Sequence, residues 1–437
     1  MTTIGLPFTK HTLANGLDVI VHEDHQLPMV AVNLWYHVGS KNERPGRTGF
    51  AHLFEHLMFE GSAHHDAGYF EPLQRAGGLI NGSTNTDRTN YWEVVPTGAI
   101  DLALWMESDR MGHLLPALTD EKFSNQRDVV LNERRQNYEN RPYGLAGVAL
   151  AAALFPPEHP YHWITIGDPE DLRAASLADV KTFFETYYHP GNASLTLAGD
   201  IETRRALELA DQYFGDIPRG PQPPPVTTAA PAIASQSLLL EDRVELPRLY
   251  LSWHSPAMFA ADDAELDLAA DVLAHGKTSR LYRQLVYERR LATDVSSYQH
   301  SRELSGLFQV ACTAAADVSL PTLEQAVTEA IQGLGDAGPT AVELARAEAQ
   351  TEAQFVYRLQ TVGGFGGKSD QLNAYNVFKS NPGFFDADLE RYQSVTGAGM
   401  AAAVRRWLVG QPRVALSLVP RGRRDLALAD ATEVQVS

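Results

Sequence analysis

Alternation of apolar and polar residues over the first forty positions predicts that the fold opens with β-strands. The dipeptide Asn15-Gly16 stands inside an alternating segment, residues 12–21, which is the usual signal of a tight β-hairpin. A longer apolar segment, residues 29–38, predicts a further strand, and the polar residues 39–46 predict the loop that follows it. The hairpin, strand and loop deliver the chain to a segment with a different period.

Residues 49–61 have the period of an amphipathic helix, with Thr48 as its expected N-cap. The polar face of this helix carries His52, Glu55 and His56. Two histidines four positions apart lie about 5–6 Å from each other on one helix surface, so both imidazoles can reach a single metal ion. The apolar face is formed by Phe50, Leu53, Phe54, Leu57 and Met58.

The string His-x-x-Glu-His is the reverse of the zincin arrangement and is the signature of the inverzincins. So short a string also arises by chance, and a third ligand is needed to support it. On a later helix Gln126, Val130 and Glu133 share one face, because seven residues return to nearly the same angle. Glu133 is therefore a candidate third ligand. Between the two helices the pattern predicts strands over 77–84 and 89–96 and a helix over 100–111, and the later helix covers 119–135 with Thr119 as N-cap.

The end of the chain echoes its middle. Residues 403–420 repeat the order helix, turn and strand with the spacing of residues 183–200, which predicts two copies of one architecture. A Pro-rich segment lies between the copies and predicts a semi-rigid linker. The second half contains nothing that resembles His-x-x-Glu-His. We therefore predict a metal-bearing domain over residues 1–218, a linker over 219–236 and a homologous second domain without a metal site over 237–437.

Composition narrows the chemistry. Cys312 is the only cysteine among the 437 residues, so a metal must be held by histidine and carboxylate rather than by thiolates. The formal net charge of −18 argues against a nucleic-acid partner. The longest apolar run, residues 145–155, is too short to span a membrane, and residues 1–10 lack the pattern of a signal peptide. We expect a cytoplasmic protein, or a periplasmic one if a signal peptide has been removed.

Two other patterns are not expected to carry chemistry. Residues 363–369 resemble a phosphate-binding loop, but Val362 stands where Walker A requires glycine and no strand precedes the segment. A hinge or surface loop is expected there. The adjacent histidines His64 and His65 lie in a polar loop, where such a pair usually faces water.

With these motifs in view, the chain resembles the pitrilysin/insulinase family of zinc peptidases, in particular its short two-domain members related to the subunits of mitochondrial processing peptidases. The resemblance implies that a glutamate on a later helix completes the metal site. Glu133 matches it, since 76 residues lie between His56 and Glu133, as in the family's best-known members. The resembling segments are 15–17, 39–40, 49–56, 77–81, 110–111, 129–134, 159–161, 166–167 and 197–200.

The resemblance also implies the fold class, which is α+β. Two homologous domains are expected, each an antiparallel-rich β-sheet backed by helices, and together they would form half of a clam-shell dimer that encloses a chamber. A peptide is expected to pair as an extended strand with an edge strand near the metal. The matching residues here are Leu79, Ile80, Asn81, Gly82, Ser83 and Thr84.

The expected activity is that of a zinc metalloendopeptidase acting on short or unfolded peptides. One Zn²⁺ per chain would be held by His52, His56 and Glu133, with a fourth position left for water. Glu55 would be the general base that takes the proton of the attacking water. The alternatives are a non-catalytic scaffold subunit of a larger complex, which has no need of all four residues, and a peptide-binding module in which zinc is structural.

The chain departs from the family pattern at two places. Gln126 stands where active relatives commonly carry a second glutamate near the metal site, and we expect this change to weaken zinc binding by about 10–100-fold. Relatives also use an arginine and a tyrosine seven positions apart to hold the substrate. Neither occurs in the corresponding segment, residues 306–310, so we expect a dimer in which a partner subunit, possibly a non-identical homologue, supplies them. The literal matches, Arg243 with Tyr250 and Arg280 with Tyr287, fall in other contexts.

Overall fold

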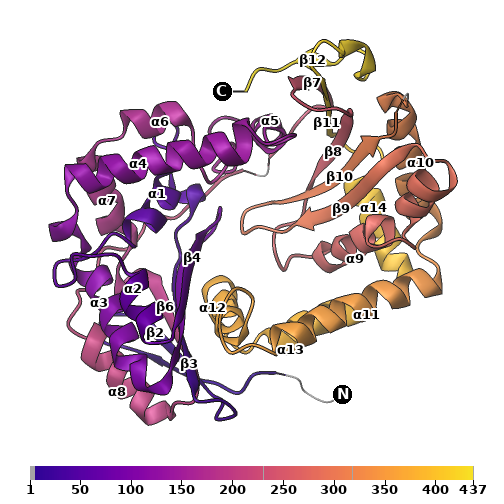
Figure 1. The fold of residues 1–437 in the computed structure, drawn as a ribbon. Coiled ribbons are helices and arrows are strands. Elements are labelled where there is room, and N and C mark those ends of the chain that lie inside the picture. The colour runs from indigo at the N-terminus through magenta and orange to yellow at the C-terminus, as the bar shows by residue number, and fades with distance from the viewer. Residues whose placement is uncertain (1–4, 230, 317, 437) are drawn as a thin grey trace. The chain divides into compact units, whose positions relative to one another are not determined.

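The computed structural model describes residues 5–229, 231–316 and 318–436, whose course is shown in Figure 1. Residues 1–4 of the predicted first domain, residue 230 of the predicted linker, and residues 317 and 437 of the predicted second domain lie outside the described residues. The contacts between Cα atoms divide the chain into two compact units, each built on one six-stranded sheet.

The sheet of the first unit is mixed but mostly antiparallel. Only the neighbours β2 and β6 run parallel, and the remaining neighbours are antiparallel. The predicted opening hairpin is confirmed, with Thr12 opposite Asp18 and with Gly16 in its turn at a φ of +91°. The strands follow the order β1 (Thr9–Thr12), β2 (Asp18–Glu23), β6 (Ala193–Gly199), β3 (Met29–Tyr36), β5 (Thr89–Pro96) and β4 (Leu79–Thr84).

The sheet of the second unit repeats this plan. Strands β7, β11, β8, β10 and β9 occupy the places that β2, β6, β3, β5 and β4 occupy in the first sheet, again with only the first pair of these five parallel. The prediction of two copies of one α+β architecture is thus confirmed. The order is β12 (Thr432–Glu433), β7 (Gln236–Asp242), β11 (Val414–Pro420), β8 (Arg248–Ser255), β10 (Gly306–Ala314) and β9 (Ala292–His300).

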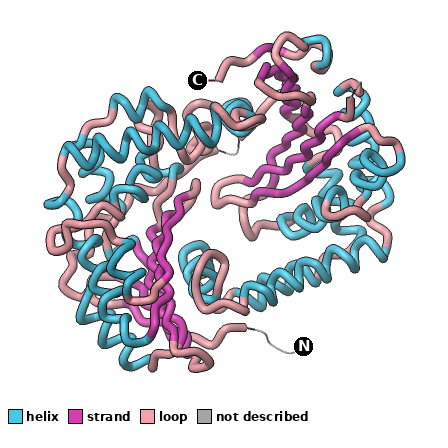
Figure 2. The backbone as a smooth tube through the Cα atoms, in the orientation of Figure 1, coloured by secondary structure: helices cyan, strands magenta, loops and turns pink. Residues whose placement is uncertain are grey.

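Helices cover both faces of the first sheet (Figure 2). Helices α3 and α12 both contact β3, but side chains alternate along a strand. The side chains of Asn33 and Trp35 donate hydrogen bonds to Ser369 and Asp370 of α12. Leu34, between them, therefore faces the side of α3. The helices of the first unit are α1 (Phe50–Leu57), α2 (Phe70–Arg75), α3 (Ile100–Ala117), α4 (Asp120–Arg134), α6 (Pro169–Ala174), α7 (Leu177–Tyr187), α8 (Thr203–Phe214) and α12 (Lys368–Lys379).

In the second unit one helix packs against β8 and β11, and three others pack against β8, β9 and β10. One helical segment, residues 282–288, is a π-helix, after which Arg289 N–H bonds to the carbonyl of Gln284. The helices of this unit are η3 (Arg135–Glu139, also π), α5 (Ala146–Leu154), α9 (Asp263–Ala274), η5 (Tyr282–Glu288), α10 (Leu320–Ala337) and α14 (Gly397–Trp407). Boundaries between the units fall inside two other helices, α11 (Ala341–Arg358) and α13 (Phe385–Gln393).

The units are not sequential, which differs from the predicted division 1–218 and 237–437. The first unit comprises residues 1–132, 164–227 and 354–387, and the second comprises the rest, so one boundary, between 227 and 228, falls inside the predicted linker 219–236. The difference arises because α5 covers the second sheet and α12 covers the first. An apolar period indicates that a helix buries one face, but it does not indicate against which sheet.

The motif helix α1 is held at its first turn by a buried carboxylate. Glu43, 9% exposed, accepts hydrogen bonds from the N–H groups of Gly49 at 2.9 Å and Ala51 at 2.8 Å. A carboxylate at a helix N-terminus satisfies free donors and favours the helix dipole. The prediction of Thr48 as N-cap was wrong, because its hydroxyl donates to Asp171 instead.

Two glycines bring the start of α1 against a later loop. Gly49 has a φ of +86° and Gly167 a φ of +78°, a region that favours glycine. A Cβ atom on Gly167 would lie 2.4 Å from the Cα atom of Gly49. This close approach explains why both segments of the sequence carry glycine, and it fixes the origin of α1.

We predict that Glu43→Gln lowers the free energy of unfolding by about 1–3 kcal/mol, because an amide can accept only one of the two bonds and turns its NH₂ group toward a donor. Denaturant unfolding, followed by circular dichroism, measures the change. Glu71→Gln is the matched control, since this side chain on α2 is 69% exposed, and it should shift stability by less than about 0.5 kcal/mol. Equal stability of the two variants would show that Glu43 does not anchor α1.

Candidate metal centre

Helix α1 presents three polar side chains on one face because its other face is fixed by packing. Phe54 is fully buried, with its ring 5.8 Å from that of Phe183 and 5.1 Å from that of Tyr188. His52, Glu55 and His56 lie on the opposite side and are half-buried. The ring centroids of His52 and His56 are 4.9 Å apart, as the spacing of four residues predicts.

Glu133 joins these histidines from the last turn of helix α4. One ligand atom from each of His52, His56 and Glu133 lies within 4.8 Å of the others. The boundary between the units falls after residue 132, inside α4. Glu133 is therefore the first residue beyond this segment of the first unit, but it belongs to the same continuous helix. Helix α4 begins with the predicted cap, since the Thr119 hydroxyl accepts the N–H of Lys122 at 3.2 Å. The structure thus brings together the three residues that the sequence singled out as ligands.

The donors of this group fit a metal ion of the zinc type. Two imidazole nitrogens and one carboxylate oxygen are the set found in catalytic zinc sites, where a fourth position stays open. The three side chains are half-buried, so the group is reachable from solvent. A site made of histidine and carboxylate alone also agrees with the single cysteine, because Cys312 is buried in the second unit.

Glu55 lies in a strongly charged neighbourhood. Burial lowers the pKa of Arg88, and the nearby carboxylates of Asp370 and Glu55 counter this shift by favouring the charged guanidinium. Arg88 also donates to the carbonyl of Ser83 at 2.8 Å. The Arg88 guanidinium therefore interacts both with the carboxylate of Glu55 and with the backbone of strand β4.

Gln126 bonds to a residue that follows α1. Its amide nitrogen donates to Glu60 Oε1 at 2.7 Å. A carboxylate at position 126 would instead face the carboxylate of Glu60, so an amide is the better partner there. An influence of Gln126 on the metal ligands stays a prediction.

Strand β4 is an edge strand, as predicted for Leu79 to Thr84. It pairs with β5 and, among the described residues, with no strand on its other side, and it contacts α1. Leu79 is 66% exposed, whereas Ile80 is 8% exposed. The glycine of this strand is tightly packed, because a Cβ atom on Gly82 would lie 3.1 Å from the rings of Phe59 and Tyr91. Glycine at this position therefore leaves room for the two aromatic rings that pack against the strand.

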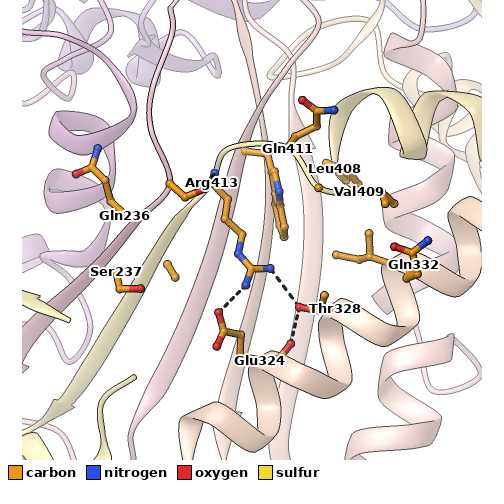
Figure 3. A pocket seen from close by; sticks show the side chains of 14 residues that line it. Gln236, Ser237, Glu324, Thr328, Gln332, Leu408, Val409, Gln411 and Arg413 are labelled. Carbon is orange, nitrogen blue, oxygen red and sulfur yellow. Dashed lines mark hydrogen bonds and ion pairs between the residues drawn. The ribbon is translucent and has the colours of Figure 1, made fainter. Parts of the chain in front are cut away.

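At each of the two literal matches one member is held by the fold, while the other, Arg243 or Tyr287, is exposed. Arg280 donates to both oxygens of Glu343 at 2.8 Å, and Tyr250 is 7% exposed. A pocket of about 420 Å³ also lies in this unit, and there Arg413 donates to Glu324 and Thr328, one turn apart on α10 (Figure 3).

One cluster escaped the analysis of the sequence. His64, expected to face water, lies with Asp109 and His113 so that one ligand atom of each is within 4.8 Å of the others. The signal was the spacing of four between Asp109 and His113 on one helix. It was missed because the helix was expected to end at Met111, whereas α3 continues to Ala117.

Comparison with known proteins agrees with this fold. Sequence models match the chain at residues 18–155, described as insulinase (peptidase family M16), and at 174–351, described as the peptidase M16 inactive domain. Zinc protease PqqE of Helicobacter pylori is 29% identical over 356 residues, covering 80% of each chain. Cytochrome b-c1 complex subunit 1 of Homo sapiens is 24% identical over 266 residues, which is 60% of this chain and 54% of that protein.

The crystal structure of a protease from Helicobacter pylori superposes with a TM-score of 0.86 and 25% identity, covering 95% of this chain and 100% of that one. Among the described residues, no helix is both long enough and apolar enough to cross a membrane. Since both matching models describe parts of one family, and the fold extends over nearly the whole of a solved protease, the chain belongs to the insulinase, or pitrilysin, family of peptidases.

Proposed function

We propose that this chain is a zinc metalloendopeptidase that hydrolyses short or unfolded peptides. The observation that carries the proposal is the grouping of His52, His56 and Glu133, one ligand atom of each lying within 4.8 Å of the others. The two histidines share one face of α1 with Glu55, and Glu133 comes from α4. When bound there, zinc would acidify a water molecule and polarise a carbonyl group. The names of relatives as zinc proteases support the choice of metal.

Glu55 would act as general base and then as general acid. Its carboxylate would accept a proton from the attacking water and return it to the nitrogen of the leaving amine, so no net proton is gained or lost. Its half-buried position on α1, one residue before His56, places it beside the ligands without making it one of the three. The guanidinium of Arg88 interacts electrostatically with this carboxylate.

The substrate would bind as an additional strand along β4. Edge strands present N–H and C=O groups that an extended peptide can pair with, and β4 contacts the metal-bearing helix α1. The exposed side chain of Leu79 and the buried one of Ile80 show that alternate residues face solvent and core. Residues Leu79 to Thr84 would therefore hold the peptide backbone. The preference for particular substrate side chains would be set by other parts of the site.

The substrate would lie in an enclosed chamber completed by a second subunit, which would supply the arginine and tyrosine that this chain lacks. In favour of this proposal, Arg280 is engaged by Glu343, and Tyr250 is buried. Each literal pair thus has one member held by internal contacts, although Arg243 and Tyr287 are exposed. The partner could be a second copy of this chain or an unlike homologue.

The alternative function is that of a non-catalytic scaffold subunit. The similarity to a subunit of the cytochrome b-c1 complex is the observation that favours it. Retention of the base Glu55 together with three ligands speaks against it, because a scaffold gains nothing from the base. The two functions differ in a direct measurement of metal and activity.

We predict that Glu55→Gln lowers cleavage of a quenched fluorescent peptide by about 10²–10⁴-fold while zinc content stays at one per chain. Glu133→Gln should lose zinc and activity together, because a neutral amide is a poor zinc ligand. Glu121→Gln, an exposed position in the first turn of the same helix, is the control and should behave as wild type. Unchanged cleavage by Glu55→Gln, or a wild-type protein without zinc, would favour the scaffold.

We also predict that the backbone of the substrate is read at alternate residues. Replacing single amides by esters, away from the scissile bond, removes one N–H donor at a time with little change in bulk. Every second replacement should lower kcat/KM by about 2–10-fold, the value of one hydrogen bond, and the others should be neutral. A uniform response along the peptide would contradict pairing with β4.

A further inference from the structure

A second group of possible ligands lies in the first unit and shares no residue with the first group. His64 belongs to the loop after α1, and Asp109 and His113 belong to helix α3. His64 Nδ1 is 2.5 Å from Asp109 Oδ1, and the ring centroids of His64 and His113 are 4.8 Å apart. One ligand atom of each residue lies within 4.8 Å of the other two.

The carboxylate of this group is buried and oriented. Asp109 is 4% exposed, and its Oδ2 atom accepts hydrogen bonds from the Ser62 hydroxyl and from the backbone N–H of His64. These bonds leave Oδ1 directed at the His64 ring. A buried carboxylate held in a fixed orientation beside an imidazole is suited to metal ligation.

A kink in α3 brings the second histidine to the same place. His113 has a non-helical backbone inside α3, at φ −137° and ψ 23°, and its carbonyl accepts the N–H of Ala63 at 2.9 Å. The loop that carries His64 is thereby tied to the kink beside His113. A hydrogen bond between a histidine and an aspartate would by itself explain two members of the group, but not the approach of the third.

We propose that His64, Asp109 and His113 form a second site for a divalent transition-metal ion of the zinc class. Two imidazoles and one carboxylate match the donor preference of Zn²⁺ and leave a position for water. Both histidines are exposed, so the ion reaches the site from solvent, whereas the carboxylate below them is buried. The net charge of −18 favours cation binding in general.

An ion at this site would join two elements that are otherwise held by hydrogen bonds. The loop of His64 leaves α1, and α3 contacts β3 and β5 of the first sheet. Binding to the folded state alone would stabilise the first unit. The site therefore has a structural role that is separate from peptide cleavage.

Equilibrium dialysis of the full-length protein against buffered Zn²⁺, with metal analysis, tests this assignment. Wild type should bind two equivalents, and His64→Ala and His113→Ala should each bind one. The matched control is His65→Ala, the adjacent histidine, whose ring packs against Tyr69 and Trp105 and is not in the group. This variant should still bind two equivalents.

Thermal unfolding gives a second readout. Raising Zn²⁺ from one to several equivalents should increase the Tm of wild type and of His65→Ala, and should leave the Tm of His113→Ala unchanged. Saturation of wild type at one equivalent that His113→Ala retains, or retention of two equivalents by His113→Ala, would overturn the site. Loss of one equivalent in His65→Ala as well would also overturn it, since the ion would then be held by the adjacent histidines His64 and His65. Wild type that binds the second equivalent but fails to cleave peptide would refute the proposed peptidase alone.

Discussion

The anchoring of helix α1 is the constraint on which the rest of the site depends. Its apolar face is held by stacked aromatic rings around Phe54, and its first turn is closed by the carboxylate of Glu43. With two sides fixed, the rotation of the helix about its axis is settled. His52 and His56 must then share a face, and only a ligand from another element can complete the group. The length of α4 sets the position of Glu133 relative to the two histidines.

The sequence predicted the parts of the site that depend on local spacing. A period of four set His52 beside His56, and the resemblance to a family of zinc peptidases identified Glu133 at a distance that no local rule covers. The same spacing of four joins Asp109 and His113, yet this pair was overlooked because the helix was expected to end at Met111, whereas α3 continues to Ala117. A residue beyond the expected end of a helix is easily assigned to a loop.

The strands and the repeated order of the two sheets followed from alternation and from the echo between residues 183–200 and 403–420. The assignment of helices to sheets did not, because it depends on pairing between distant side chains. Helix α12 meets the first sheet through polar contacts, such as Asp370 with the indole N–H of Trp35. Helix α5 meets the second through apolar ones, such as Leu150 and Leu154. Neither contact leaves a signal in one segment alone.

This exchange of covering helices bears on how the protein can be divided. A cut in the Pro-rich segment would separate α5 from the sheet it shields and would strip α12 from the other. One fragment would then bare a row of leucines to water, and the other would bare buried amides and an indole without their acceptors. The two halves are therefore obligate complements, fit for production together in one cell but not for study as isolated pieces.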